Sequence, residues 1–399
     1  MISILDLGTS KISAALASNE NNKLKILDFS TVKSEGFQSG TIVDLNLASQ
    51  SIKNCISELE SKSQQKIKNL YVSFSDEKII GNETTGHSTG NEREIVIKDM
   101  KQAMKSSTEY LVPENIDLLY PVFKDFVIDG KEGIADPRGM RGVRLQAKTH
   151  LIYCSKNMKN NIKQCVEERN NLKIQKYFFS QLGSADCTLS NDQKNLGVCL
   201  IDIGAGTTDI TVYKSGKIIF SKVFDRGGEY LTDRIAFHLE IPTDKAEEMK
   251  LKHGTALENQ ASNEILKVGN LNDGIQKEIS RRDLAKVIET HLSLLFRECL
   301  RIVQDGGFDD KIPAGFVFTG GTSNLDGIQE LGKEIMQKNV KIGSPEYNIP
   351  EISESLLKPQ YSTFVGMLNF CVKEENKHFK FNSSEGMIDQ IRGWLGLEM

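Results

Sequence analysis

Several features that would define other classes of protein are missing from this sequence of 399 residues. No stretch approaches the roughly 20 consecutive apolar residues of a membrane-spanning helix, and the first residues form neither a basic segment nor a signal-peptide core. The seven cysteines contain no CxxC pair and are scattered, which is typical of reduced thiols rather than of a disulfide framework. We therefore expect a cytoplasmic protein in which any membrane contact is confined to a surface.

An excess of positive charge is also missing, because the formal net charge is -4. Recognition of nucleic acid through its phosphates needs a basic face, so nucleic acid is not expected among the partners. What is present is the composition of a folded protein, with 26% charged and 39% hydrophobic residues. The length is too great for one compact core and predicts two to four domains.

Two segments of the sequence follow the same plan. Residues 2–12 read ISILDLGTSKI, and residues 198–213 read VCLIDIGAGTTDITVY. Each runs from apolar and β-branched residues into an Asp-x-Gly turn, after which the apolar alternation resumes, as in a β-hairpin. The repetition predicts two related lobes, each beginning with a hairpin whose turn faces the same cleft.

The two turns are candidate phosphate sites. Small residues let backbone N–H groups approach phosphate oxygens closely, and Thr9, Ser10, Thr207 and Thr208 could add hydroxyl donors. The aspartates of both turns would repel a polyphosphate unless Mg²⁺ and its water shell lay between carboxylate and phosphate. For one turn alone, an ordinary Asp-Gly hairpin explains the pattern equally well, and it is the duplication that favours phosphate.

The rest of the chain divides by pattern. Residues 82–160 combine a helix near 98–105, strands near 118–128 and 143–153 and a Gly/Pro turn at 136–140, which predicts a small inserted α/β domain. Residues 227–300 are mostly helical, with Ile288, Leu292, Leu295 and Cys299 as one buried stripe. A strand near 315–318 then enters a third glycine-rich turn at 320–323, which suits close approach to an adenosine.

Together, the three glycine-containing segments resemble the ATPase core of the actin superfamily. The resemblance implies an α/β, actin-like ATPase fold of two duplicated lobes that binds ATP and Mg²⁺. Residues 6–10 resemble its first phosphate motif, residues 202–209 its second and residues 320–323 its adenosine motif. The implied ATP-binding residues are Asp6, Gly8, Thr9, Ser10, Lys11, Asp202, Gly204, Gly206, Thr207, Thr208, Gly227, Gly228, Glu247, Lys250, Gly320, Gly321 and Thr322, with Mg²⁺ held through water by Asp6 and Asp202.

Within that superfamily, the inserted segment resembles the small domain peculiar to the FtsA family of cell-division proteins. The matching residues include Tyr120-Pro121, Asp136-Pro137, Gly139-Met140 and His150, and residues 361–366 and the last short helix are similar as well. The implied division is residues 1–81 and 161–192 for the first lobe core, 82–160 for the inserted domain, 193–226 and 300–372 for the second lobe core, 227–299 for its helical subdomain, 373–385 for a flexible linker and 386–399 for an amphipathic membrane-targeting helix.

The same resemblance implies a function. Such a protein would bind ATP, polymerise with its own copies, tether FtsZ filaments to the cytoplasmic face of the inner membrane at the division septum, and help recruit later division proteins. The implied site for the FtsZ C-terminal peptide is residues 280–289, where Arg281 or Arg282 would pair with acidic residues and Glu289 with a basic one. A solvated helix face explains these charges as well.

The C-terminal residues predict an amphipathic helix. On a 100° wheel Met387, Ile388, Ile391, Trp394 and Leu395 share one face, and Asp389 and Arg392 lie opposite. A polar tether before such a helix is typical of an interfacial anchor on an anionic membrane surface. A final helix docked on its own core is the alternative.

Hydrolysis of ATP is expected to be slow or absent. Many superfamily members place a Glu at the connection between the lobes to orient the attacking water, and Ser180 stands at that position here. Serine is a poor general base, and Gln181 could orient a water without taking its proton. Asp202 and Gln181 are the catalytic candidates, whereas His150 ends an apolar strand and is interpreted as structural.

Two other functions remain open. One is another actin-like scaffold of the PilM pilus-assembly type, which lacks a free terminal membrane helix. The other is a small-molecule kinase, for which Asp209 is the catalytic candidate nearest the second phosphate motif, although a place in the descending strand explains this residue better.

Overall fold

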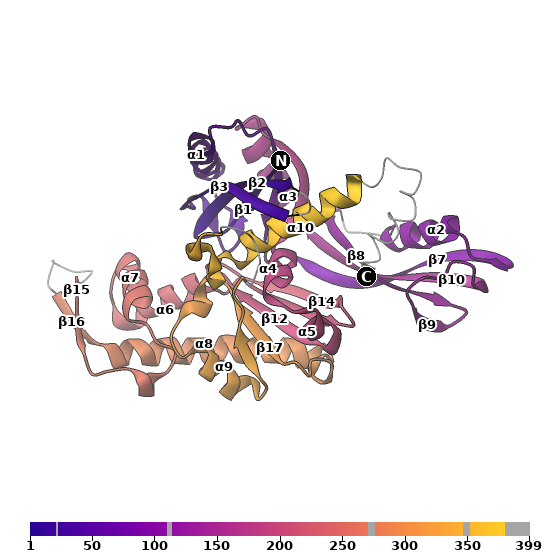
Figure 1. Ribbon diagram of the computed structural model, residues 1–399. Helices are drawn as coiled ribbons and strands as arrows, with labels where there is room; N and C mark the ends of the chain where they lie inside the picture. The colour runs from indigo at the N-terminus through magenta and orange to yellow at the C-terminus, as the bar shows by residue number, and fades with distance from the viewer. Residues whose placement is uncertain (21–22, 110–113, 270–275, 346–351, 380–399) are drawn as a thin grey trace.

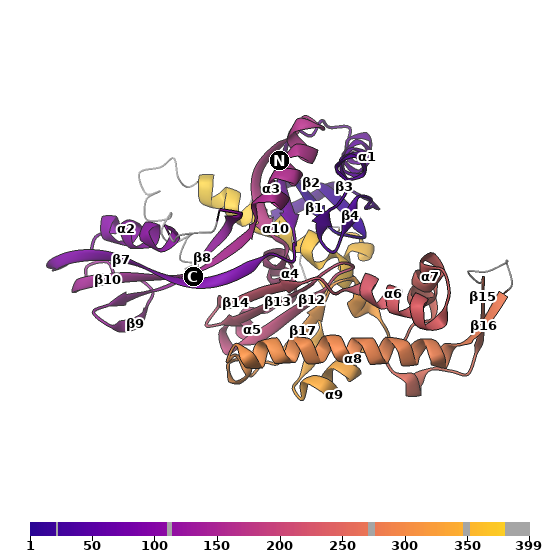
Figure 2. The ribbon, with the colours of Figure 1, turned by 180° about the vertical axis from the view of Figure 1, so that it is seen from behind.

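The computed structural model describes residues 1–20, 23–109, 114–269, 276–345 and 352–379. Its two lobes are built on sheets of the same topology (Figures 1 and 2). The first lobe has the strand order β11-β6-β1-β2-β3, and part of the second sheet repeats it as β18-β17-β12-β13-β14. In both, the first three strands in sequence pair antiparallel and the other two join in parallel. The duplication predicted from the two hairpins is therefore confirmed.

The ten strands of the duplicated sheets are five in each lobe. In the first lobe they are β1 (Ile2–Leu7), β2 (Lys11–Glu20), β3 (Lys23–Lys33), β6 (Asn69–Phe74) and β11 (Lys173–Phe179). In the second lobe they are β12 (Val198–Ile203), β13 (Thr208–Lys214), β14 (Lys217–Phe224), β17 (Phe316–Thr319) and β18 (Val340–Ile342).

The inserted segment adds four strands to the edge of the second-lobe sheet. They are β7 (Ile80–Glu94), β8 (Ile116–Ile128), β9 (Lys131–Ile134) and β10 (Arg141–Ser155). Helix α2 (Ile97–Thr108) covers them around a separate small core that includes Met100, Phe123 and Phe126. The β7 strand joins β14 at the pair Ile80–Lys222, and the resulting nine-stranded sheet extends to one side of the molecule.

Strand β7 is an element that the sequence pattern did not predict. Its inward positions Thr84, Gly86 and Ser88 are buried, and their neighbours Thr85, His87 and Thr89 are exposed. The alternation has the period of a strand, but the buried side chains are small and polar rather than apolar, so the hydrophobic signal is weak. Gly86 is needed because a Cβ there would lie 2.0 Å from the carbonyl oxygen of Ala103 in α2.

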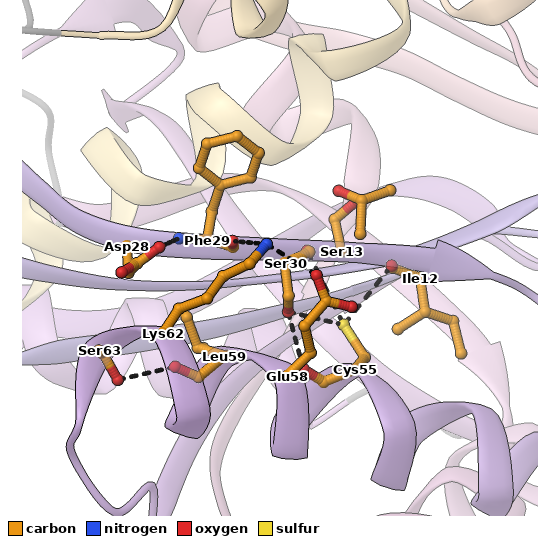
Figure 3. Close-up of polar contacts among 11 residues, drawn as sticks. Ile12, Ser13, Asp28, Phe29, Ser30, Cys55, Glu58, Leu59, Lys62 and Ser63 are labelled. Carbon is orange, nitrogen blue, oxygen red and sulfur yellow. Dashed lines mark hydrogen bonds and ion pairs between the residues drawn. The ribbon is translucent and has the colours of Figure 1, made fainter.

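Helix α1 (Leu45–Ser63) packs on the first-lobe sheet beside β2 and β3, and Figure 3 shows polar contacts that accompany this packing. The buried Ser30 hydroxyl donates to the carbonyl oxygen of Cys55 at 2.7 Å. At the helix end Lys62 donates to the carbonyl oxygen of Phe29 at 3.3 Å and pairs with Glu58 at 2.7 Å. These contacts fix the helix against β3, which pairs with β2, the strand that follows the first phosphate turn.

Two helices of the second lobe, α6 (Gly228–Leu239) and α7 (Thr243–His253), and a small hairpin lie at the opposite end of the molecule from the inserted segment (Figures 1 and 2). The long helix α8 (Arg281–Asp305) begins where Ser280 caps it by accepting a hydrogen bond from Asp283 N at 3.0 Å. Its predicted stripe is confirmed, because Ile288, Leu292, Leu295 and Cys299 are all buried. The hairpin β15 (Ile265–Gly269) and β16 (Gln276–Ser280) lies in a stretch predicted to be helical.

Other short elements complete the described chain. The remaining α-helices include α3 (Lys156–Lys163), α5 (Asn191–Leu196) and α9 (Ile328–Met336). The short strands are β4 (Phe37–Gln38) and β5 (Thr41–Ile42), and the short helices are η1 (Gln164–Glu168), η2 (Glu258–Gln260), η3 (Asp309–Lys311), η4 (Gly321–Asn324), η5 (Glu354–Leu357) and η6 (Pro359–Tyr361).

Two helices run between the lobes and cross each other. They are α4 (Ser180–Thr188) and α10 (Ser362–Phe379), and α10 runs as the long yellow helix between the two sheets in Figure 1. The predicted flexible linker is wrong for residues 373–379, which continue α10, because the Lys and Glu residues read as polar tether are good helix formers. The rest of that linker and the predicted membrane helix, residues 380–399, lie outside the described residues.

The predicted domain limits at residues 82, 160, 192 and 300 fall inside β7, α3, α5 and α8 respectively. Continuous elements therefore cross the boundaries that the sequence analysis placed there. Within the part of the chain that the structure describes, no helix is both long enough and apolar enough to cross a membrane.

Candidate functional site

A cleft of about 940 Å³ lies between the two lobes, and all three glycine-containing turns line it. Most of the residues predicted to hold the nucleotide meet there: Asp6, Gly8, Thr9, Ser10, Lys11, Asp202, Gly204, Gly206, Thr207, Gly228, Glu247, Lys250, Gly320, Gly321 and Thr322. Residues far apart in the sequence are brought together because the first two turns join β1 to β2 and β12 to β13, and the third follows β17, the strand beside β12.

Two of the predicted residues do not line the cleft. Thr208 is fully buried in β13, and its hydroxyl donates to the carbonyl oxygen of Arg226. A Cβ at Gly227 would lie 2.5 Å from the carbonyl oxygen of Ala205, so this glycine packs behind the second phosphate turn. Both residues support the turn rather than face the cleft.

The two phosphate turns close in the same way. Gly8 N donates to the carbonyl oxygen of Lys11 at 3.1 Å, and Gly204 N donates to that of Thr207 at 2.9 Å. The turns also approach each other, because a Cβ at Gly206 would lie 2.4 Å from the hydroxyl oxygen of Thr9. A side chain at residue 206 would therefore push the lobes apart.

Asp6 and Asp202 lie at the floor of the cleft, where the surrounding protein replaces most of their water. Burial raises the pKa of Asp6 to about 6, against the hydroxyl of Ser73 and the Lys11 ammonium, which lower it. Burial also raises the pKa of Asp202, against hydrogen bonds from Ser184 and Thr363. Both shifts have the sign expected for carboxylates that lack enough nearby positive charge.

This donor set fits a magnesium ion. Mg²⁺ is usually held by one or two carboxylates together with phosphate oxygens and water, and the cleft offers two carboxylates facing turns rich in backbone N–H groups. A divalent cation there would supply the positive charge and lower both pKa values. Bound Mg²⁺-nucleotide would carry the phosphate chemistry, and the two aspartates would hold its metal.

Lys11 connects the first turn to the segment before α10. Its ammonium donates to the carbonyl oxygen of Gln360 at 2.7 Å and lies 3.6 Å from the centre of the Tyr361 ring. Burial lowers the pKa of Lys11 to about 8, and Asp6 and Asp202 act in the opposite direction. Residues 360 and 361 had no predicted role in the site, although residue 361 begins the stretch 361–366 that was noted for its family likeness.

The other end of the cleft is built from the second lobe. Lys250 is 6% exposed, donates to the carbonyl oxygen of Gly228 at 2.8 Å and pairs with Glu247 at 2.6 Å. The Thr322 hydroxyl donates to the carbonyl oxygen of Gly204 at 3.1 Å. These contacts join α6 to α7 and the third turn to the second phosphate turn, and all of these segments line the cleft.

Asp209 lies in the cleft wall, which the sequence did not predict. It lies in β13, as expected, but pairs directly with Asp202 across the hairpin and is 4% exposed. Burial and the neighbouring Asp202 raise the pKa of Asp209 to about 8. The sequence could have predicted this contact, because residues equidistant from a hairpin turn are cross-strand neighbours.

Gln181 does not reach the cleft. Its amide nitrogen donates to the carbonyl oxygen of Asp209 at 2.9 Å, and its amide oxygen accepts from the Thr211 hydroxyl at 3.0 Å. Being fully buried and paired at both ends, it cannot orient a water in the cleft, whereas Ser180 lines it.

His150 also has a structural position. It is 1% exposed, and its Nε2 lies 2.9 Å from the Ser221 hydroxyl of β14. Burial lowers its pKa to about 4, so the ring is neutral and joins the inserted segment to the second lobe.

Comparison with known sequences separates the branches of the superfamily. The sequence model described as "Cell division protein FtsA" matches residues 199–366, and that of "Type IV pilus assembly protein PilM" matches residues 4–281. The cell division protein FtsA of Pseudomonas aeruginosa is 35% identical over 395 residues, covering 98% of this chain and 92% of its own. That of Escherichia coli strain K12 is 30% identical over 400 residues, covering 98% and 94%.

The chain belongs to the FtsA family of cell division proteins. The likeness extends over the inserted segment as well as the core, which confirms the resemblance drawn from residues 120–150.

Solved structures confirm the actin-like α/β fold. The PilM-PilN type IV pilus biogenesis complex aligns with a TM-score of 0.63 at 14% identity, covering 93% of this chain and 98% of that one. MreB5 of Spiroplasma citri bound to ADP aligns with a TM-score of 0.57 at 16% identity, covering 96% and 97%. At these identities the likeness concerns the fold alone.

The residues that the FtsA resemblance assigned to a partner peptide have separate positions. Arg281 lines the cleft, and its Nε donates to the carbonyl oxygen of His253 at 3.0 Å. Glu289 accepts a hydrogen bond from Glu258 N and so holds the loop before the hairpin. Of the three, Arg282 presents the most exposed charge, with a partner in Glu258 at 3.0 Å.

Proposed function

We propose that this FtsA-family protein binds ATP with Mg²⁺ in the interlobe cleft and serves as a polymerising adaptor between FtsZ filaments and the cytoplasmic face of the inner membrane at the division septum. The observation that carries the nucleotide site is the pair of matching Asp-Gly turns that face each other across the cleft. The MreB5 neighbour was crystallised bound to ADP, which supports the same ligand class.

Turnover of the bound ATP is proposed to be slow. Ser180 is the side chain of the interlobe connection that faces the cleft, and its own pKa makes it a weak base. Gln181 is held elsewhere by two hydrogen bonds. Asp202 is the remaining candidate, and its place beside the proposed metal suits a ligand better than a base.

The adaptor role rests on the sequence of the C-terminal residues. Five or six apolar side chains contribute ~1.5 kcal/mol or more each on burial, which must offset about 1 kcal/mol per residue for ordering a helix of ~12 residues. The surplus for one copy is small, so a polymer carrying many such helices would bind far better through effective concentration. Self-assembly, membrane attachment and recruitment of later division proteins would then occur together.

The membrane attachment is tested with Trp394, the single tryptophan of the chain. We expect its emission to shift to the blue when anionic liposomes are added, and to shift further with ATP and Mg²⁺. Ile391→Glu places a charge on the same helix face and should remove the shift. Emission that is already blue and indifferent to liposomes would mean that the helix is docked on the protein, and the adaptor role would fall.

The peptide site is tested on α8. Arg282→Glu should weaken binding of an FtsZ C-terminal peptide at least tenfold in a titration by fluorescence anisotropy, because it reverses an exposed charge at the proposed site. Arg297→Glu makes the same change at an exposed position further along the helix and should leave affinity unchanged. Equal affinities for the two variants would exclude Arg282 from the site.

Arg281→Glu should affect ATP binding rather than peptide binding if Arg281 belongs to the nucleotide cleft. Because Arg281 lines the cleft, its reversal should lower ATP affinity. A loss of peptide binding with unchanged ATP affinity would show that Arg281 belongs to the peptide site.

A further inference from the structure

The two aspartates of the cleft are held by hydroxyl groups from different kinds of element. In the first lobe, Ser73 donates to Asp6 at 2.8 Å, and the two residues are direct partners on adjacent parallel strands. The donor and acceptor therefore belong to one sheet, and their geometry is independent of how the lobes are oriented.

The second lobe departs from this pattern. Thr319 is the strand partner of Asp202, as Ser73 is of Asp6. Its hydroxyl, however, lies 2.9 Å from the carbonyl oxygen of Gly343 and 2.7 Å from the Ser362 hydroxyl, and is not a partner of Asp202. Thr319 occupies the position from which a side chain of the same sheet could hold Asp202, but its hydroxyl is engaged with Gly343 and Ser362.

Asp202 is held instead from the two interlobe helices. Ser184 of α4 donates to its Oδ2 at 2.6 Å. The hydroxyl oxygen of Thr363 of α10 lies 2.8 Å from that of Ser184 and 3.4 Å from Oδ2. The contacts form a chain from α10 through α4 to the carboxylate, and such chains strengthen one another.

The helices touch through their backbones at the same point. A Cβ on Gly366 of α10 would lie 1.9 Å from the carbonyl oxygen of Gly183 of α4. Polar contacts continue on either side, with Cys187 Sγ 3.0 Å from the carbonyl oxygen of Ser362 and Asn369 donating to Asp186 at 2.6 Å. At this point the two helices therefore contact each other through backbone atoms.

We propose that Ser184 and Thr363 are positioning residues that couple Mg²⁺-nucleotide at Asp202 to the crossing of α4 and α10, and hence to the angle between the lobes. This inference rests on the nucleotide site proposed above. A cation held by Asp202 would fix the position of its carboxylate, and the hydroxyls of Ser184 and Thr363 contact Oδ2 of that carboxylate at 2.6 and 3.4 Å. Occupancy thus tightens the hydroxyl chain and fixes the crossing, and α10 is the helix that leads toward the proposed membrane segment.

The experiment compares amide hydrogen exchange of α4 and of residues 362–372 in α10, with and without ATP and Mg²⁺, in the full chain. In the wild type we expect exchange in both helices to slow at least fivefold on binding. Thr363→Val keeps the shape but removes the hydroxyl, so the response of α10 should be lost while that of α4 persists. Ser184→Ala should weaken both responses, because Ser184 joins both helices to the carboxylate.

Matched variants separate this role from folding. Thr363→Ser keeps the hydroxyl and should restore the α10 response. Thr188→Val makes the same chemical change in α4, where the hydroxyl donates to the carbonyl oxygen of Ser184 in its own helix, and should behave as the wild type.

Binding of a fluorescent ATP analogue completes the test. Thr363→Val should lower affinity at least fivefold with Mg²⁺ and leave it unchanged in EDTA. An equal loss in both conditions would make Thr363 a direct nucleotide ligand and overturn the proposal, as would a wild-type exchange pattern in this variant. Failure of the wild type itself to bind the analogue would instead remove the proposed nucleotide site.

Discussion

Gly366→Ala should destabilise the protein by about 3 kcal/mol. The new methyl carbon would lie 1.9 Å from the carbonyl oxygen of Gly183 and 2.5 Å from its carbonyl carbon. These are backbone atoms of a buried helix, and a rotamer change cannot move them away. The crossing of α4 and α10 must therefore widen, which also stretches the contacts of Ser184 and Thr363 with Asp202.

The sign of this effect is diagnostic. In a helix without such a contact, replacing Gly by Ala stabilises by up to about 1 kcal/mol through helix propensity. Urea unfolding followed by circular dichroism distinguishes the two cases by the direction in which the midpoint moves. Gly321→Ala serves as the control, because a Cβ there would meet only the Cβ of Gln360 at 3.8 Å. A Gly366→Ala midpoint at or above that of the wild type would show that the helices do not touch in solution.

Asp209→Asn should stabilise the nucleotide-free protein at alkaline pH. Burial and the adjacent Asp202 raise the pKa of Asp209 from 3.8 to about 8. An acid that releases its proton near pH 4 when unfolded and near pH 8 when folded favours the unfolded state increasingly as pH rises between those values. At ~1.4 kcal/mol for each pH unit, the effect on a buried carboxyl amounts to several kcal/mol.

The measurement is the free energy of unfolding of wild type and variant between pH 5 and pH 9. We expect the two proteins to differ little at pH 5 and the variant to be more stable by at least about 2 kcal/mol above pH 8. Some pH dependence should remain, because the pKa values of Asp6 and Asp202 are raised as well. Asp310→Asn, at an exposed position, is the control that should change nothing. A difference between wild type and Asp209→Asn that does not vary with pH would contradict the assignment.

These predictions connect the cleft with the proposed division role. Asp6, Asp202 and Asp209 line the cleft close to the phosphate turns with raised pKa values, and this arrangement is unfavourable without a cation. Binding of Mg²⁺-nucleotide would relieve that cost and fix the helices between the lobes. A polymerising adaptor needs subunits of one defined shape, so nucleotide binding, rather than rapid hydrolysis, would provide the control.

The parts of the site that follow local rules could be predicted from the sequence. The Asp-x-Gly turns at Asp6 and Asp202 lie between strands of apolar residues, and their glycines and hydroxyls belong to the turns themselves. The buried stripe of α8 could also be predicted, because apolar residues recur about every 3.6 residues in a helix with one buried face. The β7 strand was not, because its buried positions are Thr, Gly and Ser.

Only the tertiary structure decided which side chains form hydrogen bonds with the aspartates of these turns. Ser184 and Thr363 reach Asp202, and Gln181 turns away from the cleft, because α4 and α10 cross where Gly183 and Gly366 allow their backbones to touch. The sequence by itself determined the duplicated turns, the actin-like fold and, through its family likeness, the branch of the superfamily. It did not determine the partners of Asp202 or Gln181, because these hydrogen bonds join segments distant in the sequence, and such pairings leave no periodic pattern along the chain.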